Sequence, residues 1–162
     1  MRVVSDDPWL NETEQRVWRS YLAMQRQLHT HLYRHLQREF GLSGSDYEIL
    51  VNLSESPTGR MRAFELGEAT DWEKSRMSHH LTRMAQRGLV RRETCAEDTR
   101  YADIVLTDEG RAAIEEAAPF HAANVRAWFM EPVGPERLAS IEEACEAVIS
   151  TLQEHDKKAT RG

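Results

Sequence analysis

The sequence predicts a mainly α-helical fold with one small β-hairpin, and three observations support this fold class. Apolar residues recur three or four positions apart over 9–40 and again over 138–152, as on one face of a helix. Two further helical segments, 62–69 and 71–87, are separated by a very short junction. After Gly88 the helical period gives way to two strand-like segments with a turn between them. Two closely joined helices followed by a hairpin are the pattern of a winged helix-turn-helix.

The first predicted helix is long for a chain of 162 residues. Asn11 followed by Glu14 is a helix start signal, and Gly41 is an expected helix end. A helix of about 28 residues extends about 42 Å, at 1.5 Å per residue, which is more than one domain of this size covers by itself. We therefore expect a partner for this helix, most simply a second copy of the same chain.

Three shorter helices are expected before the hairpin. The capping-box spacing at 45–48 predicts the start of the first, and the segment SPTGR at 56–60 ends it. The next helix is expected over 62–69. A second capping-box spacing at 70–73 then predicts the start of the helix that ends at Gly88.

The hairpin and the C-terminal helices complete the predicted fold. Residues 89–95 and 103–107 are the expected strands of the hairpin. Thr107 is expected to cap the helix that follows, in which Pro119 should produce a kink. The segment EPVGPE breaks the chain again, and Pro135 suits the first position of the last helix.

We interpret the chain, residues 1–162, as a single domain with two functional regions. Residues 43–106 form the predicted winged helix-turn-helix lobe. The long helix at 9–40 and the helices within 107–155 form the predicted dimerisation region.

One stretch of this acidic chain is free of acidic residues. The formal net charge is −6, yet residues 74–92 hold six Lys or Arg and no Asp or Glu. Residues 60–101 hold nine basic and seven acidic side chains, which is a net charge of +2. Since the whole chain carries −6, the rest of the chain carries −8. Basic helix faces are common and usually solvated, so charge alone decides nothing. Together with the helix-turn-helix and the hairpin, it indicates that a nucleic acid contacts this region only.

The helix at 71–87 is expected to carry both core and contact residues. Met77, Leu81 and Met84 fall on one face and are expected to be buried. The other faces present donors and acceptors that suit phosphates and base edges: Lys74, Ser75, Arg76, Ser78, His79, Thr82 and Arg83. The guanidinium of Arg76 suits a bidentate contact with guanine, whereas Arg91 and Arg92 suit phosphate contacts.

The segments SRMSHHLTRMAQRGLVRR and EDTRYADIVLTDEGR resemble the MarR family of bacterial transcription regulators. The first segment matches the family's recognition helix, which ends in RGLVRR. The second matches its wing pattern, D-x-R, an apolar strand and then L-T-x-x-G, here Asp98, Arg100, Leu106, Thr107 and Gly110. The coarse layout agrees with the family over residues 9–155.

The resemblance implies a homodimer with interlocking first and last helices, whose recognition helices enter successive major grooves of double-stranded DNA. The base-reading positions of the family fall on Ser75, Arg76, Ser78 and His79. Arg100 matches the wing arginine that enters the minor groove, and Asp98 matches the acidic residue that helps to orient the wing. Many relatives carry an arginine and an apolar residue at positions 79 and 80, so the base read there stays open.

The resemblance also implies a small phenolic or aromatic effector, bound where the dimerisation helices meet the DNA-binding lobe. Trp18 and Tyr47 are the candidate contact residues, and Trp72 is a weaker one. The alternative is that these aromatic side chains only form core.

No metal site and no cofactor are expected. His31 and His35 have a spacing that can share a metal ion, but no third ligand is evident, so we interpret them as surface histidines. Cys95 and Cys145 are expected to be reduced thiols. For His79 and the neighbouring His80 a neutral, hydrogen-bonding ring is preferred over a charged one.

The expected function is a ligand-responsive repressor that binds a pseudo-palindromic operator in double-stranded DNA. The alternative is a winged-helix module that docks on an acidic protein partner. No enzyme is expected, because no nucleophile elbow, phosphate-binding glycine loop or HExxH motif is present in the sequence. No apolar run of about 18 residues and no secretory signal is seen, which favours the cytoplasm and no membrane contact.

Overall fold

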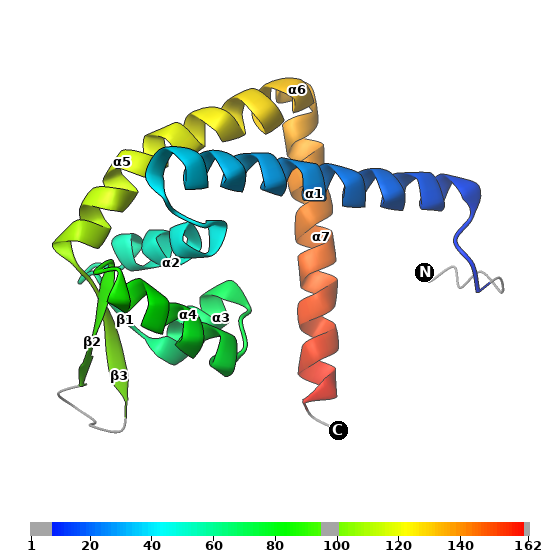
Figure 1. Cartoon of the computed structure of the whole chain (residues 1–162). Coiled ribbons are helices and arrows are strands. Elements are labelled where there is room, and N and C mark those ends of the chain that lie inside the picture. Colours follow the sequence, from blue (N-terminus) through cyan, green and yellow to red (C-terminus); the bar gives the residue numbers. More distant parts are fainter. Residues whose placement is uncertain (1–7, 95–100, 161–162) are drawn as a thin grey trace. The chain divides into compact units, whose positions relative to one another are not determined.

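A computed structural model of the chain describes residues 8–94 and 101–160. The helices are α1 (Glu12–Phe40), α2 (Gly44–Glu55), α3 (Ala63–Thr70), α4 (Lys74–Gln86), α5 (Asp108–Val125), the π-helical η1 (Arg126–Met130), α6 (Glu131–Val133) and α7 (Pro135–Ala159). The strands are β1 (Arg60–Arg62), β2 (Val90–Thr94) and β3 (Ala102–Leu106) (Figure 1). The prediction of a mainly helical winged helix-turn-helix is confirmed. The chain forms two compact units, divided after His121, which are described separately.

Helix α1 begins and ends where the sequence predicts. The side chain of Asn11 accepts a hydrogen bond from the backbone N–H of Glu14, and the Glu14 carboxylate accepts one from the backbone of Asn11. Gly41 closes the helix in the left-handed region, at φ 65°, where a side chain would be strained. Only Leu32 and Leu36 of α1 are buried within the single chain.

The predicted start of α2 is wrong by two residues. The N-cap is Ser43, and its partner in the capping box is Asp46. The pair Ser45 and Glu48 has the same spacing, so spacing alone does not separate the two choices. Tertiary contacts favour the cap at Ser43, because its partner Asp46 is buried and also binds Arg87, at the end of α4.

The second predicted capping pair is also wrong, and one strand was not predicted. The hydroxyl of Thr70 donates to the carbonyl of Leu66 inside α3, and α4 starts after Glu73 without a side-chain cap. Strand β1 pairs with β3 in a sheet of order β1-β3-β2. A strand of three residues is too short to show alternation, and its partner lies far along the sequence.

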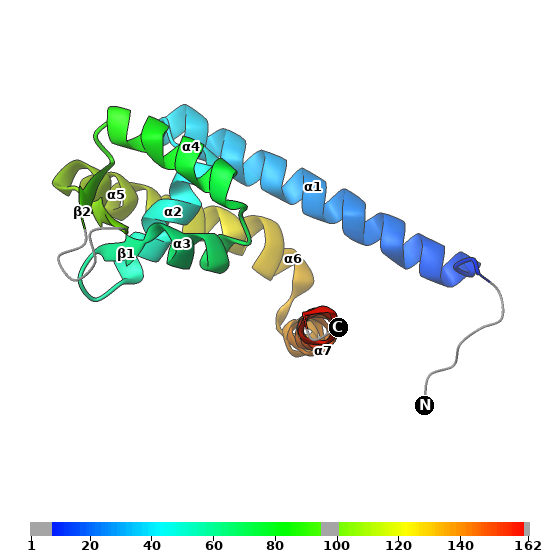
Figure 2. The same ribbon diagram turned by 90° about the horizontal axis from the view of Figure 1, so that it is seen from below.

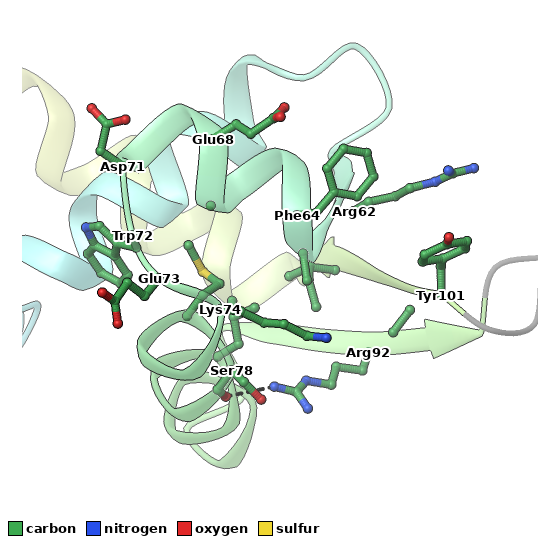
Figure 3. Close-up of a pocket in the computed structure, with 16 residues that line it drawn as sticks. Arg62, Phe64, Glu68, Asp71, Trp72, Glu73, Lys74, Ser78, Arg92 and Tyr101 are labelled. Atoms are coloured by element: carbon green, nitrogen blue, oxygen red, sulfur yellow. Dashed lines mark hydrogen bonds between the residues drawn. The ribbon is translucent and has the colours of Figure 1, made fainter. Parts of the chain in front are cut away.

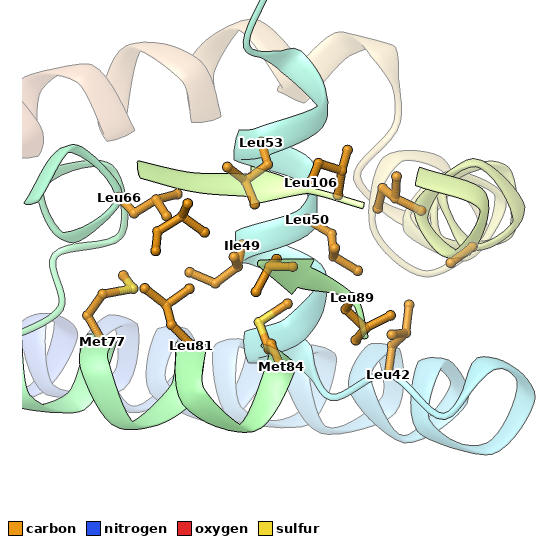
Figure 4. Packing of buried hydrophobic residues seen from close by; sticks show 14 of the residues in the cluster. Leu42, Ile49, Leu50, Leu53, Leu66, Met77, Leu81, Met84, Leu89 and Leu106 are labelled. Carbon is orange, nitrogen blue, oxygen red and sulfur yellow. The ribbon is translucent and has the colours of Figure 1, made fainter. Parts of the chain in front are cut away.

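The core of the first unit lies between α4, α2 and the sheet. Met77, Leu81 and Met84 point from α4 toward Ile49 and Leu50 of α2 (Figure 4). All five side chains are at most 2% exposed. The prediction that this face of α4 is buried is confirmed, and the opposite face is therefore the one that solvent reaches (Figure 2).

The predicted cap at Thr107 is confirmed, and it fixes α5 to the sheet. The Thr107 hydroxyl accepts a hydrogen bond from the N–H of Gly110 and donates one to the carbonyl of Gly88. A Cβ atom at Gly110 would lie 2.0 Å from the carbonyl oxygen of Leu89. Only glycine therefore lets α5 approach the start of the hairpin this closely.

Helix α5 runs on through Pro119 to Val125, and Pro135 occupies the first turn of α7 as predicted. The break predicted for EPVGPE is narrower than expected, because residues 131–133 are helical and only Gly134, at φ 77°, leaves the helix. No residue of α7 is buried within the single chain. In the described part of the chain, no helix is long and apolar enough to cross a membrane.

Candidate nucleic-acid interface

The exposed face of α4 gathers the predicted contact residues. Lys74, Ser75, Arg76, Ser78, His79 and Arg83 are all exposed, as are Arg91 and Arg92 in β2. The helix itself contains no Asp or Glu. Asp98 and Arg100, predicted for the wing, lie outside the described residues, as does Cys95.

Arg76 lies against an aromatic ring. Its Cζ atom is 3.9 Å from the centroid of the Trp72 ring, and Trp72 is only 9% exposed. Trp72 also meets the ring of His80 edge to face, with 5.4 Å between the centroids. Residues from the junction and from α4 thus form one stack, which sequence spacing did not predict.

His80 is connected to α2 through a buried carboxylate. Its Nε2 lies 2.9 Å from Oδ1 of Asp46, and the Oδ2 of Asp46 accepts a hydrogen bond of 2.6 Å from Arg87. Arg87 also donates to the carbonyl of Gly41. Burial alone would raise the pKa of Asp46, but the hydrogen bonds from Arg87 and Ser43 outweigh it and lower that pKa.

The contacts of His80 indicate which of its ring nitrogens carries the proton. A guanidinium can only donate, so the contact of 3.1 Å between Arg83 and Nδ1 makes Nδ1 the acceptor. The ring proton then resides on Nε2, facing Asp46. Burial lowers the pKa of His80, and the charges of Arg83 and Arg76 lower it further against the opposing effect of Asp46. The burial of the ring and the acceptor role of Nδ1 both favour a neutral ring.

Arg91 and Arg92 point to opposite faces of the sheet, because side chains alternate along a strand. Arg92 faces α4 and donates a hydrogen bond of 2.8 Å to the carbonyl of Ser78. Arg91 lies on the other face and donates to Glu93, which also binds Arg60. The two hydrogen bonds from Arg91 and Arg60 lower the pKa of Glu93. The sequence suggested the same role for Arg91 and Arg92, but the two side chains have different surroundings.

A groove of about 1030 Å³ lies beside the N-terminal half of α4 (Figure 3). Its lining includes Trp72, Lys74, Ser78 and Arg92 together with Phe64 of α3 and Tyr101. The sequence did not single out Phe64 or Tyr101, because a lone aromatic residue beside charged ones gives no periodic signal. Phe64 is 53% exposed, which is unusual for a phenylalanine and marks the groove wall.

Of the candidate effector residues, Trp72 lines this groove, whereas Trp18 and Tyr47 do not. Trp18 is 52% exposed on α1, where it stacks on Tyr21. Tyr47 packs against the ring of His121, with 4.4 Å between the centroids. Among residues 8–94 and 101–160, no cluster of three or more His, Cys, Asp or Glu side chains is placed to hold a metal ion.

A helix-turn-helix flanked by a sheet hairpin, with its second helix basic on the exposed face, defines the chain as a winged helix-turn-helix protein. A family model described as the MarR family matches residues 40–100. Two solved structures from Streptomyces coelicolor match much more of the chain. AbsC, a MarR family transcriptional regulator, is 42% identical, with a TM-score of 0.86 over 91% of this chain and 99% of AbsC.

The second solved structure is Sco3205, a MarR family transcriptional regulator in complex with DNA. It is 40% identical, with a TM-score of 0.87 over 92% of this chain and 94% of Sco3205. The repressor YetL of Bacillus subtilis (strain 168) is 31% identical over 97 residues, which span 60% of this chain and 58% of YetL. The chain belongs to the MarR family of transcriptional regulators.

Proposed function

We propose that the protein is a sequence-specific, double-stranded DNA-binding transcriptional regulator. The observation that carries this proposal is the exposed face of α4, which is basic and acid-free and projects from a winged helix-turn-helix lobe. Because α4 itself carries no carboxylate, phosphates meet less like-charge repulsion on this face. The DNA in the Sco3205 structure supports DNA binding, and the description of YetL as a repressor supports repression in particular.

The exposed residues divide into two proposed roles. Ser75, Arg76, Ser78 and His79 read base edges, since they lie on the solvent face of α4 and carry donors or acceptors. Lys74, Arg83, Arg91 and Arg92 contact phosphates, which position the helix without reading sequence. Asp98 and Arg100 complete the proposed site through the wing.

We propose that the protein binds DNA as a homodimer. Long helices α1 and α7 each expose apolar side chains that one chain leaves uncovered. These are Val17, Trp18, Tyr21, Leu22 and Met24 on α1, and Val148, Ile149 and Leu152 on α7. Two recognition helices related by a twofold axis read a pseudo-palindrome with half-sites about 34–36 Å apart.

We also propose that a small effector controls DNA binding. A small aromatic effector that contacts Trp18 and Tyr47 would release the DNA. The protein has no enzymatic role and acts in the cytoplasm, where its operator lies.

Selection of bound duplexes from a random pool tests this function. We expect the recovered duplexes to share a pseudo-palindrome whose half-site centres are one helical turn apart. Recovery of unrelated sequences, together with capture of an acidic protein by the same basic face, would instead support the protein-docking alternative.

A further inference from the structure

Arg76 is oriented by a side chain that precedes its own helix. Trp72 lies in the junction between α3 and α4, and its ring centroid is 3.9 Å from Cζ of Arg76. An aromatic face attracts a cation, and the indole of tryptophan does so more strongly than other rings. Trp72 is itself part of the hydrophobic core, so the ring is a fixed surface rather than a mobile one.

This contact leaves the hydrogen-bonding groups of Arg76 available. Guanidinium N–H groups point outward in the plane of the group, whereas the ring covers one of its faces. Within the described residues, Arg76 makes no hydrogen bond or ion pair that would occupy these donors, although its charge acts on the carboxylate of Glu48 in α2. The side chain is therefore both held in place and free to form a bidentate contact with a base.

Trp72 is held in turn by a chain of contacts that leads into α2. The ring of His80 meets the indole at an interplanar angle of 87°, as in an edge-to-face aromatic pair. Asp46 lies 2.9 Å from His80 and is itself bound by Arg87. The position of Arg76 thus depends on a network anchored at the start of α2.

We propose that Trp72 is a positioning residue for DNA sequence preference, which orients Arg76 to read one base pair. This inference rests on the DNA-binding function proposed above. A free arginine side chain loses much rotational freedom when it binds, and a pre-ordered one loses less. Because phosphate contacts by other side chains do not use the indole, Trp72 affects discrimination between duplexes more than overall affinity.

The test compares four proteins: wild type, Trp72→Leu, Arg76→Ala and the double variant. Dissociation constants are measured for the duplex selected by the wild type and for single base-pair variants of that duplex. We expect Trp72→Leu to lower discrimination about three- to tenfold at the same base pair as Arg76→Ala. The double variant should discriminate between the duplexes as well as Arg76→Ala does, because Trp72 acts only through Arg76.

Two further variants separate positioning from general loss of stability. Trp72→Phe keeps an aromatic face and should retain most of the discrimination. Ile49→Val removes one methyl group from the same core without touching Arg76, and should leave discrimination unchanged. All measurements are made at a temperature at which thermal unfolding shows each variant to be folded. If Trp72→Leu does not fold, Trp72→Met replaces it, both as the single variant and in the double variant with Arg76→Ala.

Equal losses on all duplexes, or a loss that adds to that of Arg76→Ala, would overturn the role of Trp72. The proposed function itself fails at an earlier step, when the wild type shows no preference among duplexes. The two failures are therefore distinct.

Discussion

At the scale of single residues, the basic stretch contains two kinds of arginine. Arg76, Arg83 and Arg87 are all exposed, but Arg87 also joins the buried Asp46 to the carbonyl of Gly41. An unpaired Asp46 carboxylate would be costly to bury, so Arg87 serves stability rather than contact with DNA. A count of basic residues therefore overstates the charge available to a nucleic acid.

We predict that Arg76→Ala and Arg91→Ala have different effects on DNA binding. Arg76→Ala should cost about 1–3 kcal/mol on the selected duplex and relax preference at one base pair. Arg91→Ala should weaken binding to all duplexes alike, because the role proposed for Arg91 is contact with phosphate. Fluorescence anisotropy on selected and random duplexes measures both. Equal losses of affinity on both duplexes for Arg76→Ala would remove its base-reading role.

His80 makes the stability of the fold depend on pH. Burial lowers its pKa below the value of about 6.5 for a free imidazole, so the unfolded chain takes up a proton at a higher pH than the folded chain does. The free energy of unfolding should therefore fall as the pH drops from about 7 through the folded pKa. Asp46 stays ionised in this window, since its own pKa is lowered below its ordinary value of 3.8.

Replacement of the histidine by an uncharged amide tests this dependence. We predict that His80→Gln reduces the fall in unfolding free energy between about pH 7 and 5, by at most about 1.4 kcal/mol per pH unit. Part of the fall remains, because burial also lowers the pKa of His121. Urea unfolding at several pH values provides the measurement, with the exposed His79→Gln as control. An unchanged pH dependence in His80→Gln would show that His80 does not titrate with folding.

At the scale of elements, α5 approaches the start of the hairpin very closely at Gly110. Thr107 and Gly110 form this junction together with the carbonyl of Leu89. Alanine favours a helix over glycine by about 1 kcal/mol, so propensity alone would make Gly110→Ala stabilising. The contact of 2.0 Å predicts the opposite sign.

We predict that Gly110→Ala lowers the free energy of unfolding by about 1–3 kcal/mol, as expected for overpacking. Chemical denaturation measures the change. The control is Glu116→Ala on the exposed face of α5, which should alter stability by less than about 0.5 kcal/mol. A gain in stability for Gly110→Ala would mean that the junction adapts to a side chain.

The sequence predicted the long periodic elements well and the contacts between them poorly. The apolar period and the caps at Asn11 and Thr107 are local signals, and both caps are confirmed. The cap predicted at Ser45 is wrong because Asp46, the partner of the observed cap, is fixed by Arg87, which lies 41 residues away in sequence. The stack of Arg76 on Trp72 was missed for a related reason, since helical spacing does not describe a residue in a junction.

At the scale of the whole molecule, the apolar side chains of α7 require a partner. Val148, Ile149 and Leu152 are each more than half exposed and lie on neighbouring turns. Apolar side chains grouped in this way on a monomer indicate an interface. Dimerisation would also supply the second recognition helix that a pseudo-palindromic site requires.

We predict that Leu152→Glu converts the dimer to monomer at micromolar concentrations and lowers affinity for the selected duplex. A buried unpaired carboxylate opposes association, and a monomer contacts only one half-site. Sedimentation velocity measures the assembly state. The matched control is Glu154→Gln, which lies near on the same helix and is exposed. A wild-type protein that sediments as a monomer would contradict the dimer.

The central claim is that α4 and the hairpin bind the phosphate backbone and the bases of duplex DNA. Its most direct test is the affinity of the wild type for the selected duplex over a range of salt concentrations. If Lys74, Arg83, Arg91 and Arg92 of both chains each neutralise a phosphate, the logarithm of the binding constant falls with the logarithm of salt concentration at a slope of about −7. A slope near zero would contradict the DNA-binding account.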